Sequence, residues 1–406
     1  MLIALAAAVI LNFYLSGAWA LTLPQTMLSG MNRFVLISLP LFVLAGGLMN
    51  AGGISARLFE FARALVGWMR GGLAHVNVLT SMFFGGMIGS STADLAGTGS
   101  IVIPAMKQNG YPAPFSAALT ASSAGIGPMI PPSSPMILYS AVTGTSLGAL
   151  FLAGVIPGIL LGLSQALIVA WLARRRGWKP FSSFAWREIL RTGRRAVLSF
   201  GLPIIIVGGL VLGVFTPTEA GAFAVVYALV LATVVYRVLT LKGVYRVMVN
   251  AVQLTGELLI IVSLSFALGA GLTNAHVPEA LTVIIDLFSF GDSQYMRILA
   301  MLILAIIAGM ILDPLIPVLL PIILPTLLAF DVDLLHFGVL MVIAVVIGQV
   351  TPPLAIALII AGRIANVDQM VVLRANMPFF YALVAFMLAA IAVPEIATWL
   401  PALIRE

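Results

Sequence analysis

The chain has 406 residues, of which 62% are hydrophobic and only 8% are charged, whereas an ordinary soluble domain carries about 25% charged residues. So few charged side chains cannot cover a water-soluble particle of this size, which excludes a soluble globular protein. Apolar stretches repeatedly exceed the roughly 18 residues that mark a membrane-crossing helix. We therefore expect an all-α polytopic membrane protein.

The net charge of +6 does not indicate a nucleic-acid partner, because the basic residues lie in short segments between apolar stretches. The chain has no cysteine, and its three histidines are far apart in the sequence. Disulfides and thiol chemistry are therefore excluded, and we expect no cofactor and no histidine-bound metal.

The expected membrane segments follow the apolar stretches in chain order, at residues 2–20, 34–52, 75–106, 115–145, 149–173, 197–238, 250–272, 295–329, 335–362 and 376–400. The first stretch has neither a basic leader nor a processing site, so we interpret it as a retained, somewhat short span. Several later stretches are too long for one crossing and contain Gly, Pro, Ser or Thr near the middle. This pattern is typical of broken helices and re-entrant hairpins.

Basic residues predict the orientation of the spans. The densest cluster, residues 174–195, is assigned to the cytoplasm. When 75–106 and 295–329 are treated as hairpins, all 20 Lys and Arg residues except Arg33, Arg297 and Arg405 fall on the cytoplasmic side. The cluster itself is expected to be a linker with an interfacial helix; docking of a partner there is an alternative.

The two halves of the chain resemble each other at an offset of 221 residues over 88–361, and at 224 residues in the pair upstream. IVIPAM (101–106) matches IILPTL (322–327), IGPMIPP (126–132) matches IGQVTPP (347–353), and Pro157 matches Pro378. Upstream, Asn50 matches Asn274. In our threading the loop 107–112 is cytoplasmic and its counterpart 331–333 is external, so the repeat is predicted to be inverted, as in many secondary transporters.

The first half contains GGMIGSSTADLAGTGS (85–100) at the expected hairpin turn. Small residues allow a tight turn and expose hydroxyls and carbonyls, which are hard ligands suited to sodium. Asp94 is a functional candidate, since a carboxylate at membrane depth is costly. Close helix packing for the small residues, and a structural carboxylate bonded to turn amides for Asp94, remain alternatives.

Next, SSAGIGPMIPPSSP (122–135) contains Pro131 and Pro132, which interrupt a helix and leave carbonyls without donors. A bound cation facing the turn would satisfy these carbonyls, although a kink that serves packing is the alternative. The second half repeats the plan with GMILDP (309–314) and GQVTPP (348–353). We predict that each turn pairs with its own break, forming two ion sites, with a substrate carboxylate against half-helix N-termini.

TPTEAG (216–221) interrupts another long stretch. We interpret it as a connector in which Thr216 or Thr218 caps the following helix, with Glu219 in its first turn.

These strings, in order GSSTAD and IPAMKQNGYP, IGPMIPPSSPMILYS, FTPTEAGA, GMILDP and LPIILP, HFGV, and GQVTPPLA, resemble the large membrane subunit of tripartite ATP-independent periplasmic (TRAP) transporters over almost the whole chain. The resemblance implies sodium-coupled uptake of an organic anion across the bacterial inner membrane, with an elevator fold and no ATP site. It also implies two partners, a small membrane subunit of about four spans and a periplasmic substrate-binding protein. The chain is shorter than fused forms, so a separate small subunit is expected.

The resemblance implies specific site residues. A first sodium site would comprise Ser90, Ser91, Asp94, Gly125, Gly127 and Pro131, and a second would comprise Gly309, Asp313, Gly348, Thr351 and Pro352. Ser133, Ser134 and Thr351 would contact the substrate. The chain departs from the family in lacking a longer first helix, and in carrying Ala355 where the family often has glycine.

The expected domain organisation has five segments. These are N-terminal scaffold helices and an arm (1–74), a first transport half with hairpin and broken helix (75–148), central scaffold spans with the linker 174–195 (149–294), a second transport half (295–375) and a C-terminal span (376–406). A stand-alone sodium-dicarboxylate carrier or antiporter of the same plan is the alternative function. A membrane enzyme is not expected, because we find only Asp94 and Asp313 near the expected midplane, without a histidine or cysteine beside them.

Overall fold

The computed structural model describes residues 2–16, 22–288 and 293–405, and throughout these ranges every extended regular element is a helix. Six of the described helical segments are long and apolar enough to cross a membrane: Phe34–Ala51, Leu147–Arg176, Trp186–Val211, Pro217–Val235, Leu241–Asn274 and Gln369–Ala392. This confirms the all-α prediction and agrees with a polytopic membrane protein.

The first half of the chain builds a helical hairpin and an interrupted helix. In order its elements are α1 (Leu2–Ser16), α2 (Thr22–Met31), η1 (Phe34–Ile37), α3 (Ser38–Ala51), α4 (Ile54–Val66), α5 (Gly72–Ile88), α6 (Ser91–Asp94), η2 (Leu95–Gly99), α7 (Ser100–Gln108), α8 (Ala113–Ala124), η3 (Gly127–Met129) and α9 (Ser134–Thr143). Here α5 to α7 form the first hairpin, and residues 125–133 form the break between α8 and α9.

The central helices are α10 (Leu147–Arg176), α11 (Trp186–Ala196), η4 (Val197–Phe200), α12 (Gly201–Val211), α13 (Pro217–Val230), η5 (Leu231–Val235), α14 (Leu241–Asn274) and α15 (Val277–Phe288). The second half contains α16 (Gln294–Gly309), α17 (Leu315–Ala329), α18 (Leu334–Gln349), α19 (Ile356–Ala365), α20 (Gln369–Ala392) and α21 (Glu395–Arg405). Here α16 and α17 form the second hairpin, and residues 350–355 break the helix between α18 and α19.

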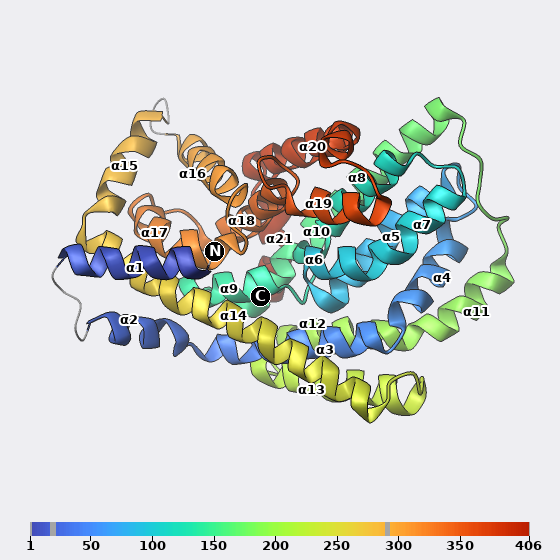
Figure 1. Cartoon of the computed structure of the whole chain (residues 1–406), viewed down its shortest axis with the longest axis horizontal. Helices are drawn as coiled ribbons and strands as arrows, with labels where there is room; N and C mark the ends of the chain where they lie inside the picture. Colours follow the sequence, from blue (N-terminus) through green and yellow to red (C-terminus); the bar gives the residue numbers. More distant parts are fainter. Residues whose placement is uncertain (1, 17–21, 289–292, 406) are drawn as a thin grey trace.

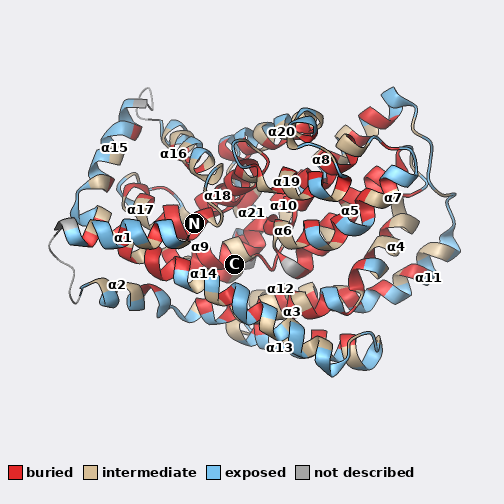
Figure 2. Cartoon of the chain, in the orientation of Figure 1, coloured by how far each residue is buried: buried red, intermediate tan, exposed pale blue. Residues whose placement is uncertain are grey.

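Figure 1 shows α11, α13 and α15 at the periphery of the view, and burial separates them from the central helices (Figure 2). The middle of α18, from His336 to Gly348, is buried without interruption, and α8 is buried from Phe115 to Ala124. By contrast, α11, α13 and α15 carry many exposed residues (Figure 2). The long helix α14 packs against α1, α2, α3 and α17, so it joins the N-terminal helices to the second hairpin.

The connector at 216–221 is capped as predicted. The hydroxyl of Thr216 accepts a hydrogen bond from the amide of Glu219 at 3.4 Å, and the Glu219 carboxylate accepts one from the Thr216 amide at 2.7 Å. This reciprocal pair is a capping box, which satisfies two amides that the start of a helix leaves free. Thr216, and not Thr218, is therefore the cap.

The basic cluster 174–195 contains the expected helix: α10 continues through Arg176, and α11 begins at Trp186 after a short linker. The structure differs from the predicted segments in two other places. The apolar stretch 376–400 is divided, because α20 ends before Pro394 and α21 follows it. An additional amphipathic helix, α15, packs against α16 and α17 where no element was predicted. For the first stretch, 2–20, residues 17–20 lie outside the described residues.

Candidate functional site

The turn of the first hairpin packs directly on the break between α8 and α9. Gly89 adopts a left-handed φ of 60°, and a Cβ atom placed there would lie 1.8 Å from the carbonyl oxygen of Pro132. The carbonyl of Gly89 accepts a hydrogen bond from the Ser134 amide at 3.3 Å. Only glycine permits this backbone conformation together with so close an approach. The predicted pairing of the first turn with the first break is therefore confirmed.

The second hairpin makes an equivalent contact. A Cβ atom on Gly348, at the end of α18, would lie 2.8 Å from the carbonyl carbon of Gly309, at the end of α16. The two backbones therefore touch without an intervening side chain. The predicted pairing of the second turn with the second break is confirmed by this contact.

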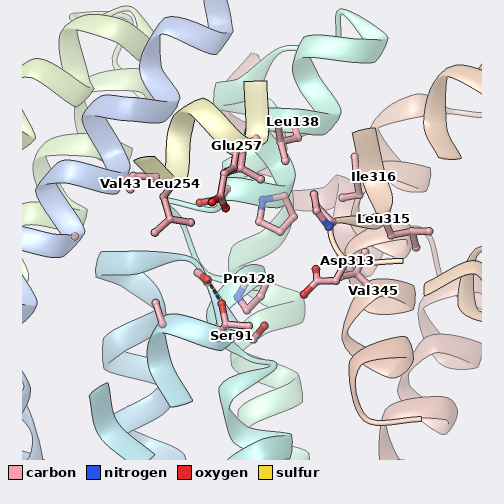
Figure 3. A pocket seen from close by; sticks show the side chains of 18 of the residues that line it. Val43, Ser91, Pro128, Leu138, Leu254, Glu257, Asp313, Leu315, Ile316 and Val345 are labelled. Carbon is pink, nitrogen blue, oxygen red and sulfur yellow. Dashed lines mark hydrogen bonds between the residues drawn. The ribbon is translucent and has the colours of Figure 1, made fainter. Parts of the chain in front are cut away.

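Both turns and both interrupted helices border one cavity of about 510 Å³. Its remaining wall comes from α3 and α14. Figure 3 shows the carboxyl groups of Glu257 and Asp313 pointing into this space from different elements. The polar side chains that line it are Asn50, Ser90, Ser91, Thr92, Ser134, Glu257, Asp313 and Gln349. A cavity of this size holds a small polar solute.

Gln349 connects the two halves at the cavity. Its Oε1 accepts a hydrogen bond from the Ser91 hydroxyl at 2.5 Å, and its side chain lines the same cavity as Asp313. One amide thus bonds a hydroxyl of the first turn and shares the cavity with a carboxylate of the second. Hydroxyl, amide and carboxylate oxygens are ligands suited to hard cations.

Asp94 lies behind the first turn and does not line the cavity. Its side chain is only 1% exposed, and its Oδ1 accepts a 2.5 Å hydrogen bond from the Thr98 hydroxyl. The Oδ2 atom has no hydrogen-bond partner among the described residues. A buried carboxylate oxygen without a donor is costly, so this atom is suited to bind a cation.

Some of the other predicted residues line the cavity, and the rest lie in the turns and breaks beside it. Ser90, Ser91, Ser134 and Asp313 line the cavity. Gly125, Gly127 and Pro131 are buried in the first break, whereas Gly309, Gly348, Thr351 and Pro352 lie at the second turn and break outside the lining.

Two of the three hydroxyls predicted to contact the substrate already form hydrogen bonds within the protein. The hydroxyl of Ser133 is buried, donates to the Pro128 carbonyl and accepts from the Met136 amide. The hydroxyl of Thr351 donates to the Ile347 carbonyl at 2.5 Å. Of the three, only Ser134 lines the cavity in this structure.

Sequence reasoning missed Asn50, Glu257 and Gln349. Asn50 was visible in the repeat, and Gln349 lies within the GQVTPP string, but neither was assigned to the site. The interpretation that Asp94 and Asp313 are the only carboxylates near the expected midplane was incomplete. A single charge inside the apolar stretch 250–272 is the signal that would have identified Glu257.

Comparison with known proteins decides which family this geometry represents. Residues 1–396 match the family model described as "Tripartite ATP-independent periplasmic transporter, DctM component". The chain belongs to this family. It is accordingly a large permease subunit of the TRAP type, a transporter component and not an enzyme.

Characterised relatives of the same TRAP type cover nearly the whole chain. It is 36% identical to the sialic acid TRAP transporter large permease protein SiaM of Vibrio cholerae, over 93% of this chain and 89% of SiaM. It is 34% identical to the C4-dicarboxylate TRAP transporter large permease protein DctM of Pseudomonas aeruginosa, over 91% and 86%. It is 32% identical to the 2,3-diketo-L-gulonate TRAP transporter large permease protein YiaN of Escherichia coli, over 95% and 91%.

Proposed function

We propose that this large permease subunit carries out sodium-coupled uptake of a small organic acid across the bacterial inner membrane. The observation that carries the proposal is the cavity bordered by both hairpin turns, the first helix break, the end of α18, and helices α3 and α14. Interrupted helices that meet at a polar cavity are the arrangement in which secondary transporters bind substrate and coupling ions.

Two groups of oxygen atoms support sodium as the coupling ion. The first surrounds Asp94, whose Oδ2 lacks a hydrogen-bond partner among the described residues, together with the predicted residues of the first turn and break. The second surrounds Asp313 and the contact between Gly309 and Gly348. Carboxylate, hydroxyl and carbonyl oxygens suit a hard monovalent cation.

The acid is proposed to bind between the two turns. Helices α9 and α17 both begin at the cavity, where Ser134, Pro135, Leu315 and Ile316 line it. The partial positive charge of both helix N-termini favours a carboxylate, and α17 also offers first-turn amides, whereas the Ser134 and Met136 amides of α9 already donate to Gly89 and Ser133. All three relatives are named for acids, which supports an organic acid as the substrate class.

We further propose an elevator mechanism in an inverted-repeat fold. The two hairpins with their broken helices would move as one unit against α3, α14 and the other scaffold helices, so that the cavity opens alternately to each side. The assembly would also need a small membrane subunit of about four spans and a periplasmic substrate-binding protein. The designation "large permease protein" in the relatives' names supports the first partner.

The test is uptake of radiolabelled acids into proteoliposomes that contain this chain and its small subunit, with and without the binding protein. We expect uptake that requires both an inward sodium gradient and the binding protein. Sodium-driven uptake without the binding protein would instead support a stand-alone carrier. Uptake driven by a proton gradient alone would overturn the assignment of sodium as the coupling ion.

A further inference from the structure

The two walls of the cavity differ in electrostatic character. One wall contains the first turns of α9 and α17, each longer than two helical turns, with Ser134 and Leu315 at the cavity. Both helix ends contribute partial positive charge, and free first-turn amides come from α17 alone, because the Ser134 and Met136 amides of α9 donate to Gly89 and Ser133. This wall is therefore suited to a carboxylate.

The opposite wall carries a full negative charge. Glu257 extends from α14 into the cavity (Figure 3), and the residues of α14 that line it beside Glu257 are Leu254, Leu258 and Ile261. Between Arg246 and the end of α14, Glu257 is the only charged residue. Its side chain is exposed, and no hydrogen bond or ion pair joins it to another described residue.

No basic side chain balances this charge within the cavity. Among the described residues that line it, the ionisable ones are Glu257 and Asp313, and neither Lys, Arg nor His is present. Asp313 lies on the wall of the second turn, where the proposed sodium site would neutralise it. Glu257 faces it from α14, outside both proposed sodium sites.

A carboxylate within an apolar helix is costly unless a cation or a functional partner accompanies it. An acid with only negative groups would bring a like charge close to Glu257 within the confined cavity, where the two charges repel more strongly than when they are separated in bulk water. A substrate with a positive group on the side opposite its carboxylate would instead be attracted at both ends.

We propose that the transported acid is a zwitterion of the amino-acid type, whose carboxylate faces α9 and α17 and whose ammonium group pairs with Glu257. This inference rests on the proposed function and specifies the substrate class of the same cavity. Glu257 acts as a specificity residue, since it selects for the positive group and has no part in ion coupling.

The experiment uses acids of matched size that differ in one substituent. The sets are L-aspartate, L-malate and succinate; L-glutamate, 2-hydroxyglutarate and glutarate; and L-alanine, L-lactate and propionate. Uptake is measured under a sodium gradient with the complete three-part assembly. Wild type is compared with Glu257→Gln, which removes the charge at nearly constant shape, and with Glu257→Asp, which keeps it. Glu395→Gln, at an exposed position in α21, is the matched control.

In at least one set, we expect wild type to favour the amino acid over its hydroxy and unsubstituted counterparts. Glu257→Gln should reduce that preference roughly tenfold or more, whereas Glu257→Asp should retain much of it and Glu395→Gln all of it. Because every assembly contains the same binding protein, the difference between variants reports on the cavity. Residual sodium-driven uptake by Glu257→Gln would show that this variant is folded.

Sodium-driven uptake in which the hydroxy or unsubstituted acid equals or exceeds the amino acid in every set would overturn this inference and leave the proposed function intact. So would an amino-acid preference that Glu257→Gln does not change. Failure of a sodium gradient to drive uptake of any member of the panel would contradict the proposed function and this inference with it.

Discussion

The hydroxyl of Ser91 donates a 2.5 Å hydrogen bond to the side-chain oxygen of Gln349, which joins the turn of the first hairpin to the end of α18 in the second half. The two residues are far apart in sequence and meet at the cavity that both line. The contact joins the first turn to a residue that shares the cavity with Asp313 of the second turn.

This contact predicts non-additive effects. Ser91→Ala and Gln349→Ala should each weaken sodium-dependent uptake, and the double variant should be little worse than the more severe single one, since each substitution removes the same bond. We expect a coupling energy of about 0.5–3 kcal/mol. A double-mutant cycle on the sodium concentration for half-maximal uptake measures it, and strictly additive effects would exclude functional coupling through this bond.

The buried carboxylate of Asp94 predicts a second result. Asp94→Asn removes the negative charge but keeps the shape, so we expect a higher sodium requirement and much slower uptake. The matched control is Asp331→Asn, at an exposed residue with a φ of 52°, a conformation that asparagine also tolerates. If Asp94→Asn transported with the sodium dependence of wild type, Asp94 would not belong to a sodium site.

Two glycines with left-handed backbones separate steric from conformational effects. At Gly89 an added Cβ would meet the Pro132 carbonyl, whereas at Gly144, with a φ of 75°, nothing lies within 4 Å. Gly144→Ala should cost about 1–2 kcal/mol through its backbone alone, while Gly89→Ala should also separate the turn from the break and abolish uptake. Comparison of apparent melting temperature and uptake tests this, and equal behaviour of the two variants would contradict it.

Ala355 adopts a left-handed conformation with a φ of 47° immediately before α19. A residue with a Cβ atom is disfavoured there by about 1–2 kcal/mol. Ala355→Gly should therefore raise the apparent melting temperature. Ala357→Gly, inside α19, should lower the melting temperature, because glycine inside a helix reduces the free energy of unfolding by about 1 kcal/mol. A lower melting temperature for Ala355→Gly would show that lost packing outweighs the relieved backbone.

Composition and local chemistry predicted much of the fold. Apolar length identified the membrane-crossing helices, and Thr216 with Glu219 identified a helix start, because both signals act over a few neighbouring residues. The paired turns and breaks could also be predicted. Gly89, Gly309 and Gly348 permit tight turns and close backbone contacts, and Pro131 interrupts a helix.

The cavity wall was harder to predict. Glu257 joins the site only because α14 lines the cavity, and sequence patterns do not determine which scaffold helix takes that place. Ser133 and Ser134 are adjacent, yet only Ser134 lines the cavity, because Ser133 is used as the cap of α9. The orientation of neighbouring side chains at a break depends on packing across the whole molecule.

The ratio of sodium ions to acid molecules tests the central claim most directly. The chain and its partners are reconstituted in proteoliposomes, and the acid gradient that stops net uptake is measured at several imposed sodium gradients. Two sodium sites, one at each turn and break, predict a ratio of at least two sodium ions for each acid. Uptake whose equilibrium does not respond to the sodium gradient would contradict the account.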